Sequence, residues 1–178
     1  MASILDNPTF RADFARLEAV RLNPERHTAP NALVHSEQVA RRAQDLAALN
    51  RLSDSDTRTL IELAYVHDIG KTAGTANPSA SVDLLPRYGI VEPSFTELVK
   101  LHDINLPWHL SMLRGEAPTD KAWRRLAGRV DLRLLCIFMI ADRVDCPGGW
   151  RRNAPLVWFL DEVARRGLST EPLELDDA

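Results

Sequence analysis

The chain has 178 residues, of which 45% are hydrophobic and 26% are charged, and its formal net charge is −3. This composition is ordinary for a globular protein, and the length suits one domain with its own core. The slight negative charge argues against an electrostatic grip on long duplex DNA. Two cysteines are too few for a disulfide scaffold, no apolar run is long enough to span a membrane, and the N-terminal stretch carries charges where a signal peptide would need an apolar core. We therefore expect a cytoplasmic protein.

Two helices are predicted ahead of the most informative motif. The first covers residues 7–22, because Asn7-Pro8 is a favourable helix start and apolar residues follow at helical spacing. His27 falls in the loop that follows, where a surface role is expected. The second is a long helix over residues 30–52, which carries His35 on or beside its apolar face.

The next helix ends in two neighbouring side chains that can bind metals, His67 and Asp68, followed by Gly70 and Lys71. Neighbouring side chains on a helix point about 100° apart, but a loosened last turn and a left-handed exit at Gly70 would let both reach one atom. A carboxylate buried under an apolar helix is costly unless it is paired or metal-bound. In the alternative interpretation, His67 only complements the helix dipole and Asp68 lies in solvent.

The second half of the chain also predicts helices. Small and polar residues 72–77 form a loop that could act as a lid beside the motif. The segment 130–143 is apolar on almost every side, which is typical of the buried centre of an all-α bundle. Other helices are expected over residues 78–85, 93–102, from 106 onward, 119–129 and 153–168. No alternating β pattern of any length appears, so the predicted class is all-α.

The order His35, then His67-Asp68, then Asp142, with all four on apolar helices, resembles the HD-domain metal-dependent phosphohydrolases. Residues 98–102 are similar to the family's mid-chain histidine helix, and residues 140–143 are similar to its closing aspartate helix. The motif His-Asp-x-Gly-Lys and the ending Ala-Asp-Arg are most similar to the HD domains attached to bacterial tRNA nucleotidyltransferases.

The resemblance implies a single-domain helical bundle of HD type over residues 1–178. Its core would cover about residues 30–150, with the helices 7–22 and 153–168 packed on it. Gly70 and Lys71 stand where some HD proteins carry a glutamate, which separates this chain from the guanosine-tetraphosphate hydrolases that rely on that acid.

The resemblance also implies a metal site formed by His35, His67, Asp68 and Asp142. Two imidazoles and two carboxylates suit a divalent Mn, Fe, Co, Ni, Zn or Mg ion, and they leave octahedral positions open for water and substrate. The expected reaction is hydrolysis of a phosphoester, above all a nucleotide or another small phosphorylated metabolite, by a metal-activated water. One ion is expected, and a second stays open.

Other side chains are given roles around this site. Asp68 is the expected general base, and Lys71 is expected to bind a phosphate oxygen, with a solvated helix-end cation as its alternative. Arg143 is a weaker candidate for the same task. His102 is expected to contact the substrate or donate a proton, and His109, beyond the break at Pro107, is a further candidate substrate contact.

Two other classes of function stay open. A di-iron HD-type oxygenase would need both His102 and His109 as ligands. A catalytically silent metal- or nucleotide-binding regulatory domain would keep the site without turnover. The basic helix 121–129 and the pair Arg151-Arg152 could guide RNA, but a solvated face is favoured over nucleic-acid binding. The expected partner is a small-molecule phosphoester, and the sequence carries no signal for an oligomeric state.

Overall fold

The computed structural model describes residues 3–169 and 171–175, and within these ranges helices form the fold, with one isolated bridge between Arg21 and Asn31 as the only β pairing. The α-helices are α1 (Pro8–Ala15), α2 (Ala32–Leu49), α3 (Asp54–Val66), α4 (Pro78–Leu84), α5 (Pro93–Leu101), α6 (Asn105–Leu113), α7 (Asp120–Ala127), α8 (Leu132–Ala141) and α9 (Ala154–Arg165). The 3-10 helices are η1 (Ile4–Asp6), η2 (Arg16–Ala19), η3 (Ile69–Ala73), η4 (Leu85–Tyr88) and η5 (Trp150–Arg152). The predicted all-α class is confirmed.

No helix among the described residues has both the length and the apolar character needed to cross a bilayer.

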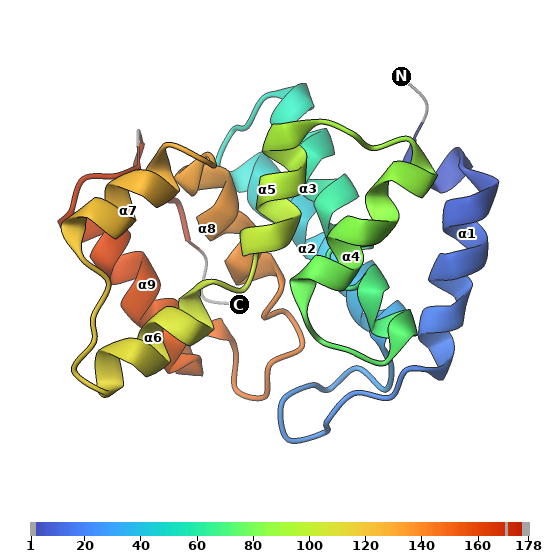
Figure 1. Cartoon of the computed structure of the whole chain (residues 1–178), viewed down its shortest axis with the longest axis horizontal. Helices are drawn as coiled ribbons and strands as arrows, with labels where there is room; N and C mark the ends of the chain where they lie inside the picture. Colours follow the sequence, from blue (N-terminus) through green and yellow to red (C-terminus); the bar gives the residue numbers. More distant parts are fainter. Residues whose placement is uncertain (1–2, 170, 176–178) are drawn as a thin grey trace.

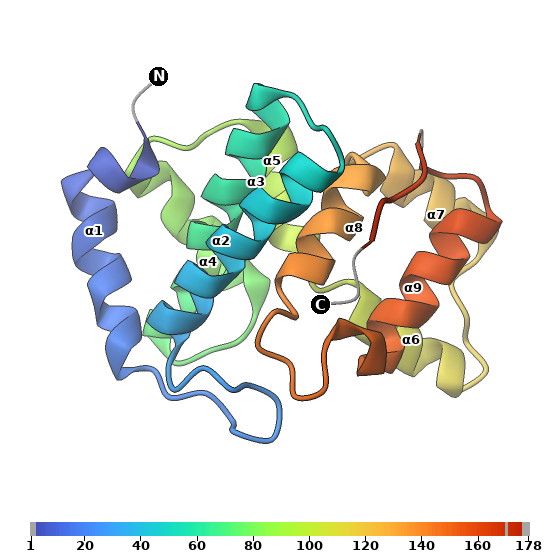
Figure 2. The ribbon, with the colours of Figure 1, turned by 180° about the vertical axis from the view of Figure 1, so that it is seen from behind.

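Helix α8 lies at the centre of the molecule. It separates a group formed by α1 to α5 from a group formed by α6, α7 and α9, as the two opposite views show (Figures 1 and 2). Every residue of α8 except Arg133 is buried. This position explains why its sequence is apolar on almost every side, because each face contacts another element.

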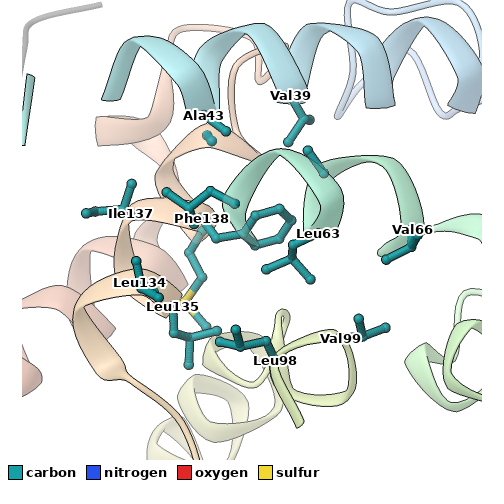
Figure 3. Packing of buried hydrophobic residues seen from close by; sticks show 14 of the residues in the cluster. Val39, Ala43, Leu63, Val66, Leu98, Val99, Leu134, Leu135, Ile137 and Phe138 are labelled. Atoms are coloured by element: carbon teal, nitrogen blue, oxygen red, sulfur yellow. The ribbon is translucent and has the colours of Figure 1, made fainter. Parts of the chain in front are cut away.

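The core around α8 fixes the helices that carry the candidate site. Phe138 of α8 is fully buried and its ring points toward Leu63 of α3, with Val39 and Ala43 of α2 on one side and Leu98 of α5 on the other (Figure 3). A ring held among three other helices leaves little freedom for their relative positions. The C-terminal ends of α3, α5 and α8 are therefore held in a defined arrangement.

The turn after α3 is held by Ser81 of α4. The Ser81 hydroxyl donates to the carbonyl of His67 (2.7 Å) and accepts from the backbone N–H of Gly70 (2.9 Å). Gly70 does not adopt the left-handed conformation expected from the sequence, and the left-handed residue is Gly74, with φ of 77°. Gly70 is needed for a different reason: a Cβ there would lie 2.4 Å from the backbone nitrogen of Ser81. Glycine allows α4 to pack directly on the turn.

Replacing Gly70 with alanine is expected to lower the free energy of unfolding by about 1–3 kcal/mol, the usual cost of forcing a methyl group into a packed interior. Chemical denaturation measures this loss. Gly128→Ala is the matched control, because a Cβ there would meet its nearest atom at an ordinary 3.5 Å. Equal stability of the two variants would contradict the close-approach explanation.

Candidate metal centre

Four helices, α2, α3, α5 and α8, bring polar side chains together in the interior of the protein. His35 comes from α2, His67 and Asp68 follow α3, His102 follows α5, and Asp142 follows α8. All five are buried, with exposed fractions of 8% or less. The convergence of these residues, which the sequence predicts from four separate segments, is present in the structure.

The ligand-type atoms of this group face one another at short distances. His35 Nε2 lies 3.0 Å from Asp142 Oδ1 and 3.9 Å from Asp68 Oδ2. His67 Nε2 lies 3.3 Å from both Asp68 Oδ2 and Asp142 Oδ1. One atom each from His35, His67 and Asp68 lies within 4.8 Å of the other two, a spacing that suits a shared ion. Asp142, at the end of α8, lies next to the same group, because its Oδ1 contacts the Nε2 atoms of both His35 and His67.

The orientation of the His67 and His102 rings leaves one nitrogen of each available. His67 Nδ1 donates to the carbonyl of Ala64 (2.9 Å), and His102 Nδ1 donates to the carbonyl of Val99 (2.7 Å). A carbonyl can only accept, so Nδ1 carries a proton, and in the neutral form of each ring the lone pair is on Nε2. His67 Nε2 is buried and has no hydrogen-bond partner within residues 3–169 and 171–175. An orphaned lone pair between two carboxylates fits a divalent metal ion.

The charges around the centre also fit a cation. Burial alone would raise the pKa of Asp68, but His67 and Lys71 hold it well below its usual range. For Asp142, burial is again outweighed, here by Arg143 and the neighbouring histidines, which lower its pKa. Both carboxylates are therefore ionised. Burial would lower the pKa of His67, but Asp68 and Asp142 raise it, so the carboxylates attract positive charge to this position.

The two cations predicted to meet a phosphate lie at this centre and contact its carboxylates. Lys71 Nζ is 2.5 Å from Asp68 Oδ2. Arg143 contacts Asp142 through Nη1 and lies 2.8 Å from Asp103 Oδ1 through Nη2. Both side chains are mostly enclosed, with 19% of Lys71 and 17% of Arg143 exposed. Neither residue is a freely solvated helix-end cation.

A cavity of about 490 Å³ opens above these side chains. Its lining includes the predicted residues His35, Asp68, Lys71, His102, Asp142 and Arg143, together with Arg26, Asn105 and Arg152. Asn105 is fully buried, and neither polar atom of its amide has a hydrogen-bond partner in the part of the chain that the structure describes. The cavity is thus lined by metal-binding, cationic and amide groups from several elements.

His109 is the predicted site residue that the structure brings neither to this cavity nor to the buried centre. Pro107 lies in the first turn of α6, where a missing N–H costs little, so it does not break the helix as expected. The helix instead carries His109 toward α9, where its ring packs edge-on against Trp158 with centroids 5.6 Å apart. A dinuclear site that needs both His102 and His109 is not supported by this arrangement.

Two residues beside the site were not predicted to belong to it: Asp145, and His27, for which a surface role was expected but whose side chain is 21% exposed and contacts Asp145. Asp145 is buried with an exposed fraction of 3%, and both of its carboxylate oxygens lie close to His27 Nδ1, at 3.1 and 3.0 Å. The same carboxylate lies 3.2 Å from His35 Nδ1. Burial would raise the pKa of Asp145, but His27 and His35 lower it well below its usual range. Its position one turn beyond Asp142 was the only signal in the sequence.

An all-α fold with a buried centre of histidines and aspartates at helix ends defines a recognisable class of proteins. A family model described as HD domain matches residues 33–146. The chain therefore belongs to the HD domain family, which implies metal-dependent phosphohydrolase-type activity in general and a divalent metal in the centre. Comparison with curated proteins and with solved structures found no match.

Proposed function

We propose that this protein hydrolyses a small phosphoester, with a nucleotide or a similar phosphorylated metabolite as its substrate. The observation that carries the proposal is the buried group of His35, Asp68 and Asp142, which line a cavity of about 490 Å³, with His67 3.3 Å from both carboxylates. This volume is in the range of pockets that enclose small molecules. A divalent ion bound there would supply positive charge to the phosphoryl oxygens and lower the pKa of a bound water.

The side chains around the cavity are proposed to position water and phosphate. Asp68 is ionised and opens to the cavity, so it can accept a proton from the attacking water. Lys71 and Arg143 also line this cavity, and their positive charges complement the charge of a phosphate. His102 directs Nε2 away from its bond to Val99, and in its neutral form this nitrogen accepts hydrogen bonds. We therefore assign His102 an accepting contact to substrate or water in preference to proton donation.

The cationic rim supports a negatively charged substrate. Arg26 and Arg152 line the cavity from the loop before α2 and from η5. The Arg152 side chain packs over Gly148, where its Cδ would lie only 2.5 Å from an added Cβ. A glycine at this turn therefore leaves room for the arginine beside the cavity. With Lys71 and Arg143, four Lys and Arg side chains line the cavity alongside its carboxylates, and they can complement the charge of a phosphorylated metabolite.

The test is a screen of the metal-stripped protein, reloaded in turn with each candidate divalent ion, against nucleoside mono-, di- and cyclic phosphates. Phosphate or nucleoside release that requires the ion and stops with a chelator is the expected result. Oxygen uptake without phosphate release would favour the di-iron oxygenase. Nucleotide binding without turnover under every loading would favour the regulatory domain. Either result would contradict the proposed hydrolysis.

Lys71→Met is expected to reduce kcat/KM about 10- to 150-fold, which corresponds to losing one charge-assisted contact of about 1.5–3 kcal/mol. Methionine keeps most of the aliphatic stem, so the fold should be retained. The measurement is hydrolysis of the best substrate from the screen, alongside thermal unfolding. Unchanged activity, or a loss explained by unfolding, would remove Lys71 from the site.

A further inference from the structure

Asp145 lies behind the metal centre, on the far side of His35. The imidazole of His35 stands between two carboxylates: Nε2 is 3.0 Å from Asp142 Oδ1, and Nδ1 is 3.2 Å from Asp145 Oδ2. Both His35 and Asp145 have side-chain exposed fractions of 1%. The contact at Nδ1 is close but does not meet the geometry of a hydrogen bond, and among the described residues this nitrogen has no hydrogen-bond partner. Asp142 competes for the proton through its hydrogen bond to Nε2, so Asp145 is the group that can hold the proton on Nδ1 once Nε2 binds an ion.

The chemistry of imidazole gives this contact a consequence. A ring that binds a metal through Nε2 needs its lone pair there, so its proton must be on Nδ1. An ionised carboxylate can only accept, so it favours the tautomer with the proton on the nitrogen that faces it. Carboxylates placed behind metal-binding histidines fix the ring orientation and strengthen the ligand in this way.

His27 holds the carboxylate of Asp145 in place. Both oxygens of Asp145 lie within 3.1 Å of His27 Nδ1, and the His27 ring packs edge-on against His35 with centroids 5.0 Å apart. The backbone is tied as well, because the N–H of Thr28 donates to the carbonyl of Asp145 (2.8 Å). The loop before α2 and the turn after α8 are thus joined at one carboxylate.

We infer that Asp145, held by His27, is a positioning residue that keeps the Nδ1 proton of His35 directed away from the metal and Nε2 directed toward it. This inference rests on the proposed function, because it assumes that the centre binds a divalent ion. It adds to the centre two residues outside the four predicted ligands, and His27 lies before the segment that the family model matches.

The first test measures Co²⁺ affinity of the full chain by competition with a chromogenic chelator. Asp145→Ala should weaken Co²⁺ binding about 10- to 100-fold, the usual effect of losing an outer partner of a ligand, and should alter the visible spectrum of the bound Co²⁺. Asp145→Asn keeps an oxygen that can accept from His35 Nδ1, so it should lose less than about 10-fold. Asp13→Asn is the control, a buried carboxylate that accepts from Tyr88 outside the cavity (2.9 Å), and it should bind Co²⁺ normally.

The outcomes separate the inference from the function on which it rests. Wild-type affinity in Asp145→Ala would overturn the inference and leave the proposed function standing. Loss of a whole equivalent of Co²⁺, with the remaining ion bound as in the wild type, would make Asp145 a ligand and would also overturn it. A wild-type chain that binds no Co²⁺ would remove the proposed function and the inference together.

A second measurement does not depend on the folding of any variant. In the Zn²⁺-loaded wild-type chain, nitrogen-15 spectra of the histidine side chains should show His35 with a proton on Nδ1 and the metal on Nε2. The opposite assignment would overturn the inference.

Discussion

His67→Ala is expected to reduce bound metal to background and to lower hydrolysis more than about 100-fold, beyond the usual cost of losing an outer partner of a ligand. The reason lies in the geometry of one atom. His67 Nε2 lies 3.3 Å from both Asp68 and Asp142, is buried, and has no hydrogen-bond partner among the described residues. Without it, the two carboxylates lose the neutral ligand that lies between them.

Metal content after dialysis, measured by mass spectrometry, is the direct readout. His67→Gln is the second variant, because it keeps a polar side chain of similar length and limits the cavity left by alanine. His109→Ala is the matched control: it removes a half-buried imidazole that packs on Trp158, so both metal and activity should persist. Unchanged metal content in both His67 variants would show that the centre does not bind the ion.

His102→Ala is expected to lower kcat about 10- to 150-fold, which corresponds to losing one hydrogen bond to a charged group of about 1.5–3 kcal/mol, while most of the metal is retained. Its ring lies 5.2 Å from that of His67, centroid to centroid, and both rings are oriented by a carbonyl three residues earlier. Burial and the neighbouring His67 lower the pKa of His102, so the ring stays neutral and presents an accepting Nε2 to the cavity.

The comparison of His102→Ala with His102→Gln separates the remaining roles. A glutamine oxygen can accept a hydrogen bond near the position of Nε2, so partial recovery indicates a substrate contact, and no recovery indicates proton transfer. Loss of one of two metal equivalents would instead make His102 a ligand of a second ion. Unchanged turnover in both variants would place His102 outside the reaction.

The four predicted ligands come from the resemblance to HD domains, and the structure brings them together at or near the ends of apolar helices. His35 lies beside the apolar stripe of α2, and Asp142 ends the apolar run of α8, so local pattern and chemistry agree. Asp145 and His27 could not be found in this way. They lie in loops whose meeting depends on packing between α2 and α8, and no period relates two loops across 118 residues.

Two predictions from the sequence are wrong because they assign glycine and proline their commonest structural roles. Gly70 was expected to provide a left-handed turn, but its missing side chain is needed for the close approach of Ser81. Pro107 was expected to break a helix, but it lies in the first turn of α6, which carries His109 away from the cavity. In both cases a tertiary neighbour decides the role, and that neighbour is not visible from local sequence.

The central position of α8 has a consequence for the order in which the chain can fold. Helices α1 to α5 are synthesised first and contain His35, His67, Asp68 and His102 at or near their ends, yet the surface that receives Phe138 stays open until α8 emerges. Before that moment the nascent chain exposes an apolar groove, the kind of surface that chaperones bind. The fourth predicted ligand, Asp142, arrives at the end of the same helix. The docking of α8 therefore buries Phe138 and brings the fourth predicted ligand to the other three in a single step.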